Sequence, residues 1–128
     1  MKRLLLGILF VLFLSSYAFA VNTVTTSVDY YGKLVTVQVV PDAGTAWDSP
    51  AAYTNGLNVA AILFVPSAAN DRLVVRDVAA GGNVIFNDIS LDGGSRVLYI
   101  GRRIKPYILK ADCTLGTPAN VRIVFILQ

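Results

Sequence analysis

The sequence contains no histidine, no glutamate and only one cysteine. Without histidine the chain has no Ser-His-Asp or Cys-His nucleophile pair, no imidazole for acid–base catalysis and no histidine ligand for zinc. The eight acidic residues are all aspartates, which favour turns, and they are scattered rather than gathered in a pair. The glycine pairs at 81–82 and 93–94 lie between apolar runs, not before a helix that could hold a phosphate. These absences predict a protein that is not an enzyme and that has no cofactor, no catalytic residue and no metal site.

Cys113 is the single cysteine, so no disulfide can form within the chain. One interpretation makes its side chain a small apolar group that packs in the core. The other makes Cys113 the site of an intermolecular disulfide between two copies. Either way, the core must be stable without an internal disulfide.

The first twenty residues have the three parts of a secretory signal peptide. Lys2 and Arg3 form the positive region, residues 4–14 are an apolar run, and Ala18 and Ala20 are the small residues that signal peptidase requires. We therefore predict cleavage before Val21, which makes residues 1–20 the signal peptide and residues 21–128 the secreted domain. The alternative is a retained membrane anchor, although the strictly apolar run would cover only about 16 Å as a helix.

The predicted mature chain carries almost no net charge. Removal of Lys2 and Arg3 leaves nine basic residues against eight aspartates. This balance gives no reason to expect nucleic acid as a partner, and a membrane is expected only if residues 1–20 are retained. The predicted location is secreted, which means periplasmic, extracellular or at the cell surface.

The rest of the chain alternates between β-branched apolar runs and short turns of Gly, Asn, Asp and Pro. Period-two alternation, as in residues 34–40, indicates half-buried strands. The predicted strands are 24–31, 34–40, 57–66, 72–78, 84–89, 96–100, 107–115 and 121–127. The first two are expected to form a hairpin, the third to be central in a sheet, and the last to pair inside a sheet. The predicted fold is all-β: a single antiparallel β-sandwich, jelly-roll or immunoglobulin-like, of seven or eight strands after the signal helix.

Two stretches could bind a ligand. Residues 41–56 form a long irregular segment with Trp47 and Tyr53, which could be an aromatic platform for a sugar or could fold back over the core. Arg102, Arg103 and Lys105 form a basic cluster that could bind a phosphate or an acidic polysaccharide, or could lie in a solvated loop. These five residues are the predicted ligand-binding set.

From residue 71 onward the layout of runs and turns resembles that of the short β-sandwich accessory proteins that phages and prophages encode. The residues behind the resemblance are Leu73-Val74-Val75-Arg76, Val84-Ile85-Phe86, Asp92-Gly93-Gly94, Lys105-Pro106-Tyr107-Ile108 and Ala119-Asn120-Val121-Arg122-Ile123-Val124-Phe125. The resemblance covers residues 71–127, less than half of the chain, and it assigns no site residue. It implies a component of a virion.

The function expected first is therefore that of a non-enzymatic secreted or surface structural protein. Such a protein would associate with itself, as a homo-oligomer or polymer, or would decorate an extracellular assembly. Two other functions stay open at this point: a carbohydrate- or ligand-binding module that recognises a glycan, and a phage virion component.

Overall fold

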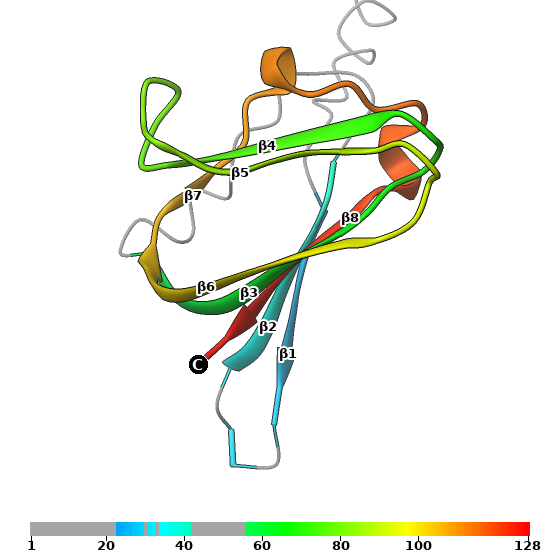
Figure 1. The fold of residues 1–128 in the computed structure, drawn as a ribbon. Helices are drawn as coiled ribbons and strands as arrows, with labels where there is room; N and C mark the ends of the chain where they lie inside the picture. The colour runs from blue at the N-terminus through cyan, green and yellow to red at the C-terminus, as the bar shows by residue number, and fades with distance from the viewer. Residues whose placement is uncertain (1–22, 30, 33, 42–55) are drawn as a thin grey trace, which may run out of the picture.

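The described residues of the chain form two antiparallel β-sheets and almost no helix (Figure 1). The computed structural model describes residues 23–29, 31, 32, 34–41 and 56–128, and for residues 34 and 35 it describes only the backbone. The all-β class and the antiparallel pairing expected from the sequence are confirmed. Within the described ranges, no helix is long and apolar enough to span a membrane.

The larger sheet has five strands in the order β1-β2-β8-β3-β6. The strand bounds are β1 (Thr23–Val28), β2 (Leu34–Val40), β3 (Leu57–Val65), β6 (Arg96–Ile104) and β8 (Arg122–Leu127). Strands β1 and β2 form the expected hairpin, β3 lies between β8 and β6, and the C-terminal β8 is paired on both sides. The apolar β8 is thus protected from contact with other chains, as predicted.

The smaller sheet has three strands in the order β5-β4-β7. They are β4 (Asp71–Asp77), β5 (Val84–Ser90) and β7 (Pro106–Tyr107). The prediction of one strand over residues 107–115 is wrong, because β7 ends at Tyr107 and a short 3-10 helix, η2 (Lys110–Asp112), interrupts the segment before Thr114 forms an isolated bridge to Arg72. A second 3-10 helix, η3 (Pro118–Asn120), precedes β8. Pro106 has no amide hydrogen, which is compatible with its place as the first residue of β7.

Three of the strand pairs are nested about a common centre. Asp71 pairs with Ser90, Leu57 with Ile104 and Val37 with Phe125, so that the two numbers of each pair add up to 161 or 162. The pairs β4–β5, β3–β6 and β2–β8 are therefore successive parts of one long antiparallel ribbon whose tip lies between β4 and β5.

The hydrophobic core receives side chains from both sheets. Phe64 of β3 and Phe86 of β5 meet edge to face, with ring centroids 6.2 Å apart and planes at 77°, a favourable aromatic geometry. The buried cluster consists of Val37, Val39, Leu57, Val59, Ile62, Phe64, Leu73, Val75, Phe86, Ile104, Ile108, Val121, Ile123 and Phe125. Alternate residues of β2, β3 and β8 supply most of it, as the period-two pattern of these strands predicts.

Candidate interaction surface

Strands β5 and β6 are edge strands that follow each other in the chain. Among the described residues β5 pairs only with β4, and β6 pairs only with β3. Residues 91–95 connect them, so one edge of the smaller sheet and one edge of the larger sheet lie on the same side of the molecule (Figure 1). We call this side, residues 84–104, the β5–β6 edge. Edge strands expose unpaired backbone groups and can pair with another chain.

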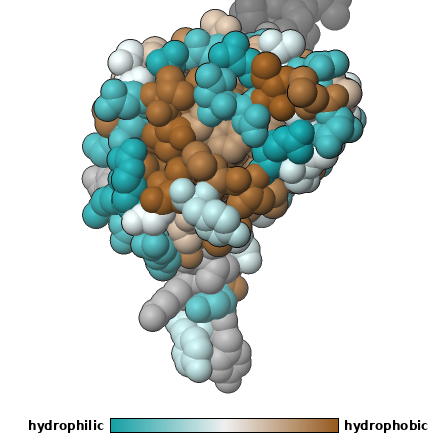
Figure 2. Space-filling model, viewed as in Figure 1, coloured by the Kyte–Doolittle hydropathy of each residue, from teal (hydrophilic) through white to brown (hydrophobic). Residues whose placement is uncertain are grey.

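The β5–β6 edge is unusually apolar for an exposed surface. Ten large hydrophobic residues are exposed in the described part of the chain, and six of them lie here: Val84, Ile89, Leu91, Val97, Leu98 and Tyr99. Tyr99 is 84% exposed and Val97 is 52% exposed. Figure 2 shows hydrophobic side chains gathered in the middle of this face, with hydrophilic residues around them. A contiguous apolar patch with a polar rim is typical of a protein–protein contact site.

Both faces of β6 contribute to this patch. Leu98 pairs with Ile62, a core residue, and therefore lies on the core side of the sheet. Val97 and Tyr99 alternate with Leu98 and lie on the opposite face. A partner that pairs with β6 would cover both faces at once.

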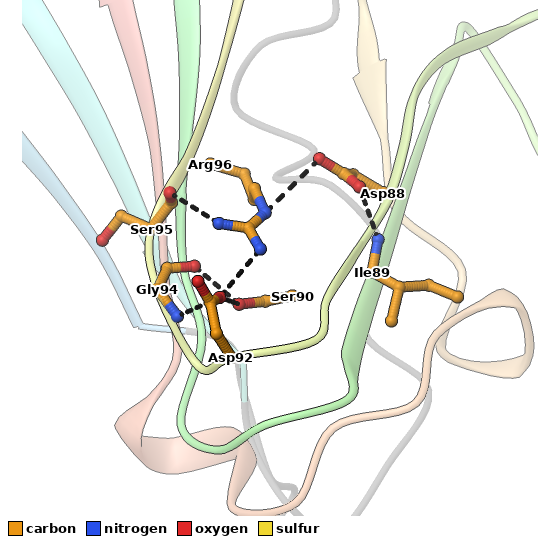
Figure 3. A network of polar contacts seen from close by, with 7 residues as sticks. All are labelled: Asp88, Ile89, Ser90, Asp92, Gly94, Ser95 and Arg96. Carbon is orange, nitrogen blue, oxygen red and sulfur yellow. Dashed lines mark hydrogen bonds and ion pairs between the residues drawn. The ribbon is translucent and has the colours of Figure 1, made fainter.

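An arginine and two aspartates occupy the start of β6 (Figure 3). Arg96 Nη2 donates to Asp92 Oδ1 at 2.8 Å, and Arg96 Nε lies 3.8 Å from Asp88 Oδ2. The Gly94 amide also donates to Asp92 Oδ1, at 2.9 Å. This amide, and then Arg96, hold the pKa of the Asp92 carboxyl below its ordinary value. Asp92 is nevertheless 71% exposed in its side chain and can meet a partner.

The other end of β6 is basic. Arg102 Nη1 lies 3.6 Å from Asp77 Oδ2, and Asp77 Oδ1 accepts a hydrogen bond from the Lys105 amide at 2.8 Å. Arg102, Arg103 and Lys105 are all exposed. The β5–β6 edge therefore runs from an acidic end at Asp88 and Asp92, through an apolar middle, to a basic end.

The structure describes three of the five predicted ligand-binding residues. Trp47 and Tyr53 lie outside the described residues. Arg102 is paired with the core-facing Val59, whereas Arg103 is paired with the exposed Asn58. The two arginines thus lie on opposite faces of the sheet, and Lys105 follows the end of β6. Ligand binding by these residues stays a prediction.

The two arginines of the basic cluster belong to strand β6 rather than to a loop, whereas Lys105 lies between β6 and β7. Gly101, which the sequence suggests as a strand end, adopts a φ of 63°. Here two residues of β6, Ile100 and Gly101, face one residue of β3, so the strand continues through a β-bulge to Ile104. A left-handed φ is open to glycine at no steric cost.

Cys113 is half-buried against the core cluster. Its Sγ lies 3.5 Å from the Val74 amide nitrogen, and burial raises the pKa of the thiol. The thiol also borders a shallow hollow of about 280 Å³ that is lined by Lys110, Cys113, Thr114, Leu115 and Pro118. A raised pKa keeps the sulfur protonated and slows thiol exchange. The intermolecular disulfide at Cys113 stays a prediction.

The described aspartates bind protein groups. In the described ranges no three acidic or cysteine side chains gather as a metal site would require. No family model, curated protein or solved structure matches the chain. Its function is therefore inferred from its own surface.

Proposed function

We propose that this protein is a non-enzymatic structural protein that assembles with other protein surfaces through its β5–β6 edge. The observation that carries the proposal is the concentration of exposed apolar side chains on two consecutive edge strands. A soluble domain that kept such an edge uncovered would be prone to uncontrolled association. The setting we propose is a secreted, cell-surface or virion assembly, in keeping with the signal-like residues 1–20.

For the fold we propose a jelly roll, which is one kind of β-sandwich. The nested pairs β4–β5, β3–β6 and β2–β8 favour this order, because a jelly roll consists of eight strands in two Greek keys, in which late strands return beside early ones. An immunoglobulin-like order, the alternative from the sequence, does not nest its strands about one tip.

Burial of the apolar middle of the edge supplies the binding free energy. Covering a large apolar side chain contributes about 1.5–3 kcal/mol. Val97 is already about half buried, so Val97 and Tyr99 together account for at least tenfold in affinity, since each factor of ten corresponds to about 1.4 kcal/mol. The bound partner would also satisfy the free backbone groups of the edge.

The test is the size of the protein in solution, by sedimentation velocity over a range of concentrations. We expect the wild-type protein to form species larger than a monomer, and Val97→Lys/Tyr99→Lys to weaken this association at least tenfold. The chain provides a matched control, Val28→Lys/Tyr31→Lys, because Val28 is 54% exposed and Tyr31 is 82% exposed, close to the values of the test pair. We expect the control to associate like the wild type. A monomeric wild type that also recovers no partner from native material would refute the proposal.

A further inference from the structure

We propose that the first partner of the β5–β6 edge is a second copy of the same chain. The two copies pair along β6 in antiparallel fashion, about a two-fold axis that lies midway between Leu98 of one copy and Leu98 of the other. The inference rests on the proposed function, because it names the partner and the register of that same surface. Three properties of β6 carry it: the alternation of its faces, the position of its bulge and the order of its charges.

The alternation restricts where the axis can lie. A two-fold axis perpendicular to a sheet leaves each side chain on its own face, so core-facing residues must pair with core-facing residues. One residue of β6 must therefore pair with the same residue of the second copy. When this residue is Leu98, it meets Leu98 of the second copy on the core side. On the outer face, Val97 meets Tyr99 of the second copy, an aromatic and β-branched pair that stabilises sheets.

The bulge and the apolar side chains together select Leu98 as the centre. The regular edge of β6 begins at Arg96 and ends at Tyr99, because Ile100 and Gly101 form the bulge. A bulge twists the strand and breaks the ladder, so pairing beyond it is disfavoured. The central residue is therefore Val97 or Leu98. Pairing about Val97 would place Arg96 opposite Leu98, whereas pairing about Leu98 places Val97, Leu98 and Tyr99 opposite apolar or aromatic residues of the second copy.

The charges favour the same arrangement. Asp88 and Asp92 lie at the start of the edge, whereas Arg102, Arg103 and Lys105 lie at its end. Antiparallel pairing brings the acidic end of each copy to the basic end of the other, and the two-fold symmetry repeats this contact. Arg96 forms an ion pair with Asp92, and Arg102 forms one with Asp77. The charges of these two arginines are therefore balanced within each copy when the edges pair. Complementary charges fix the register and the choice of partner.

The test is a symmetric disulfide at the axis. In a Cys113→Ala background, Leu98→Cys places two cysteines directly opposite each other, with Cα atoms about 4.5–5.5 Å apart, which a disulfide can bridge. We expect a covalent dimer under mild oxidation. The matched control is Arg103→Cys in the same background, because its two copies would lie roughly 33 Å apart at ~3.3 Å per residue. It should stay monomeric on a non-reducing gel.

A second variant tests the charges without touching the apolar middle. Arg103→Glu/Lys105→Glu makes both ends of the edge acidic, and we expect it to weaken the dimer at least tenfold at low salt. Lys110→Glu, a charge reversal on η2 away from the edge, should leave the dimer unchanged. If the wild type associates but Leu98→Cys does not cross-link and the charge reversal has no effect, the two-fold pairing is wrong and the assembly function stands. A monomeric wild type overturns both.

Discussion

Replacement of Asp71 by asparagine is expected to destabilise the protein by about 3 kcal/mol. Asp71 is 2% exposed, and its carboxylate accepts four hydrogen bonds. Oδ2 accepts from the Ser67 amide at 2.6 Å, the Ser67 hydroxyl at 2.7 Å and the Ala68 amide at 3.0 Å, and Oδ1 accepts from the Gly116 amide at 2.7 Å. An asparagine can replace only one of the two oxygens, so its amide group would face at least one buried donor.

This loss would affect three segments at once. Asp71 begins β4, Ser67 lies in the turn after β3, and Gly116 lies in the segment that leads to η3. The carboxylate therefore joins the start of the smaller sheet to both neighbouring connections. Denaturant unfolding measures the effect, and Asp92→Asn is the control, because Asp92 is exposed and should matter much less. Equal effects of the two variants would show that the buried network is unimportant.

The same carboxylate makes stability depend on pH. Burial acts to raise the pKa of Asp71, but the hydrogen bonds from Ser67, Gly116 and Ala68 outweigh it and hold this pKa below its ordinary value of 3.8. A depressed folded-state pKa contributes stability that is fully present above the unfolded-state value and is lost as the pH falls through the folded-state value. We expect the wild type to lose this contribution below about pH 4, whereas Asp71→Asn should lack that part of the acid transition.

Truncation of Phe64 to alanine is expected to cost about 3–5 kcal/mol. Phe64 is fully buried on β3, an inner strand of the larger sheet, and its ring contacts Phe86 of the smaller sheet. The substitution leaves a cavity between the sheets and removes an aromatic contact between them. The free energy of unfolding, measured in denaturant, reports the loss.

Two further variants make this result specific. Phe64→Leu keeps much of the volume and should cost far less than the alanine variant. Tyr31→Ala removes a similar ring from an exposed position and should change stability by no more than about 0.5 kcal/mol. A small effect of Phe64→Ala, comparable with that of Tyr31→Ala, would contradict the packing of the two sheets around this ring.

Much of the fold could be predicted from local patterns. Alternating apolar residues place β2 at residues 34–40 as observed, and turn residues separate β3, β4 and β5 within one or two positions. The errors lie where the local pattern indicates something else than the structure shows. Gly101 indicates a turn, yet it accommodates a bulge that extends β6 to Ile104. The predicted strand over 107–115 ends at Tyr107, because the 3-10 turn of η2 (Lys110–Asp112) interrupts it.

The candidate surface could not be predicted in the same way, because exposure depends on strand order. The run Val97-Leu98-Tyr99-Ile100 looks like any buried strand, and its apolar residues do not indicate that β6 lies at an edge. Asp71 likewise looks in the sequence like any of the eight aspartates. The amide of Gly116, which donates a hydrogen bond to it, is 45 residues away. The one local signal is the position of arginines on both sides of the apolar run, a common feature of edge strands.

Amide hydrogen exchange at low and high protein concentration tests assembly through the β5–β6 edge most directly. If the edge is the contact, amides within Arg96–Ile100 should exchange more slowly at high concentration. The Thr23–Val28 amides of β1, at the opposite edge of the same sheet, should exchange at an unchanged rate. Unchanged exchange along β6 at every concentration, or protection that appears on β1 instead, would contradict the account.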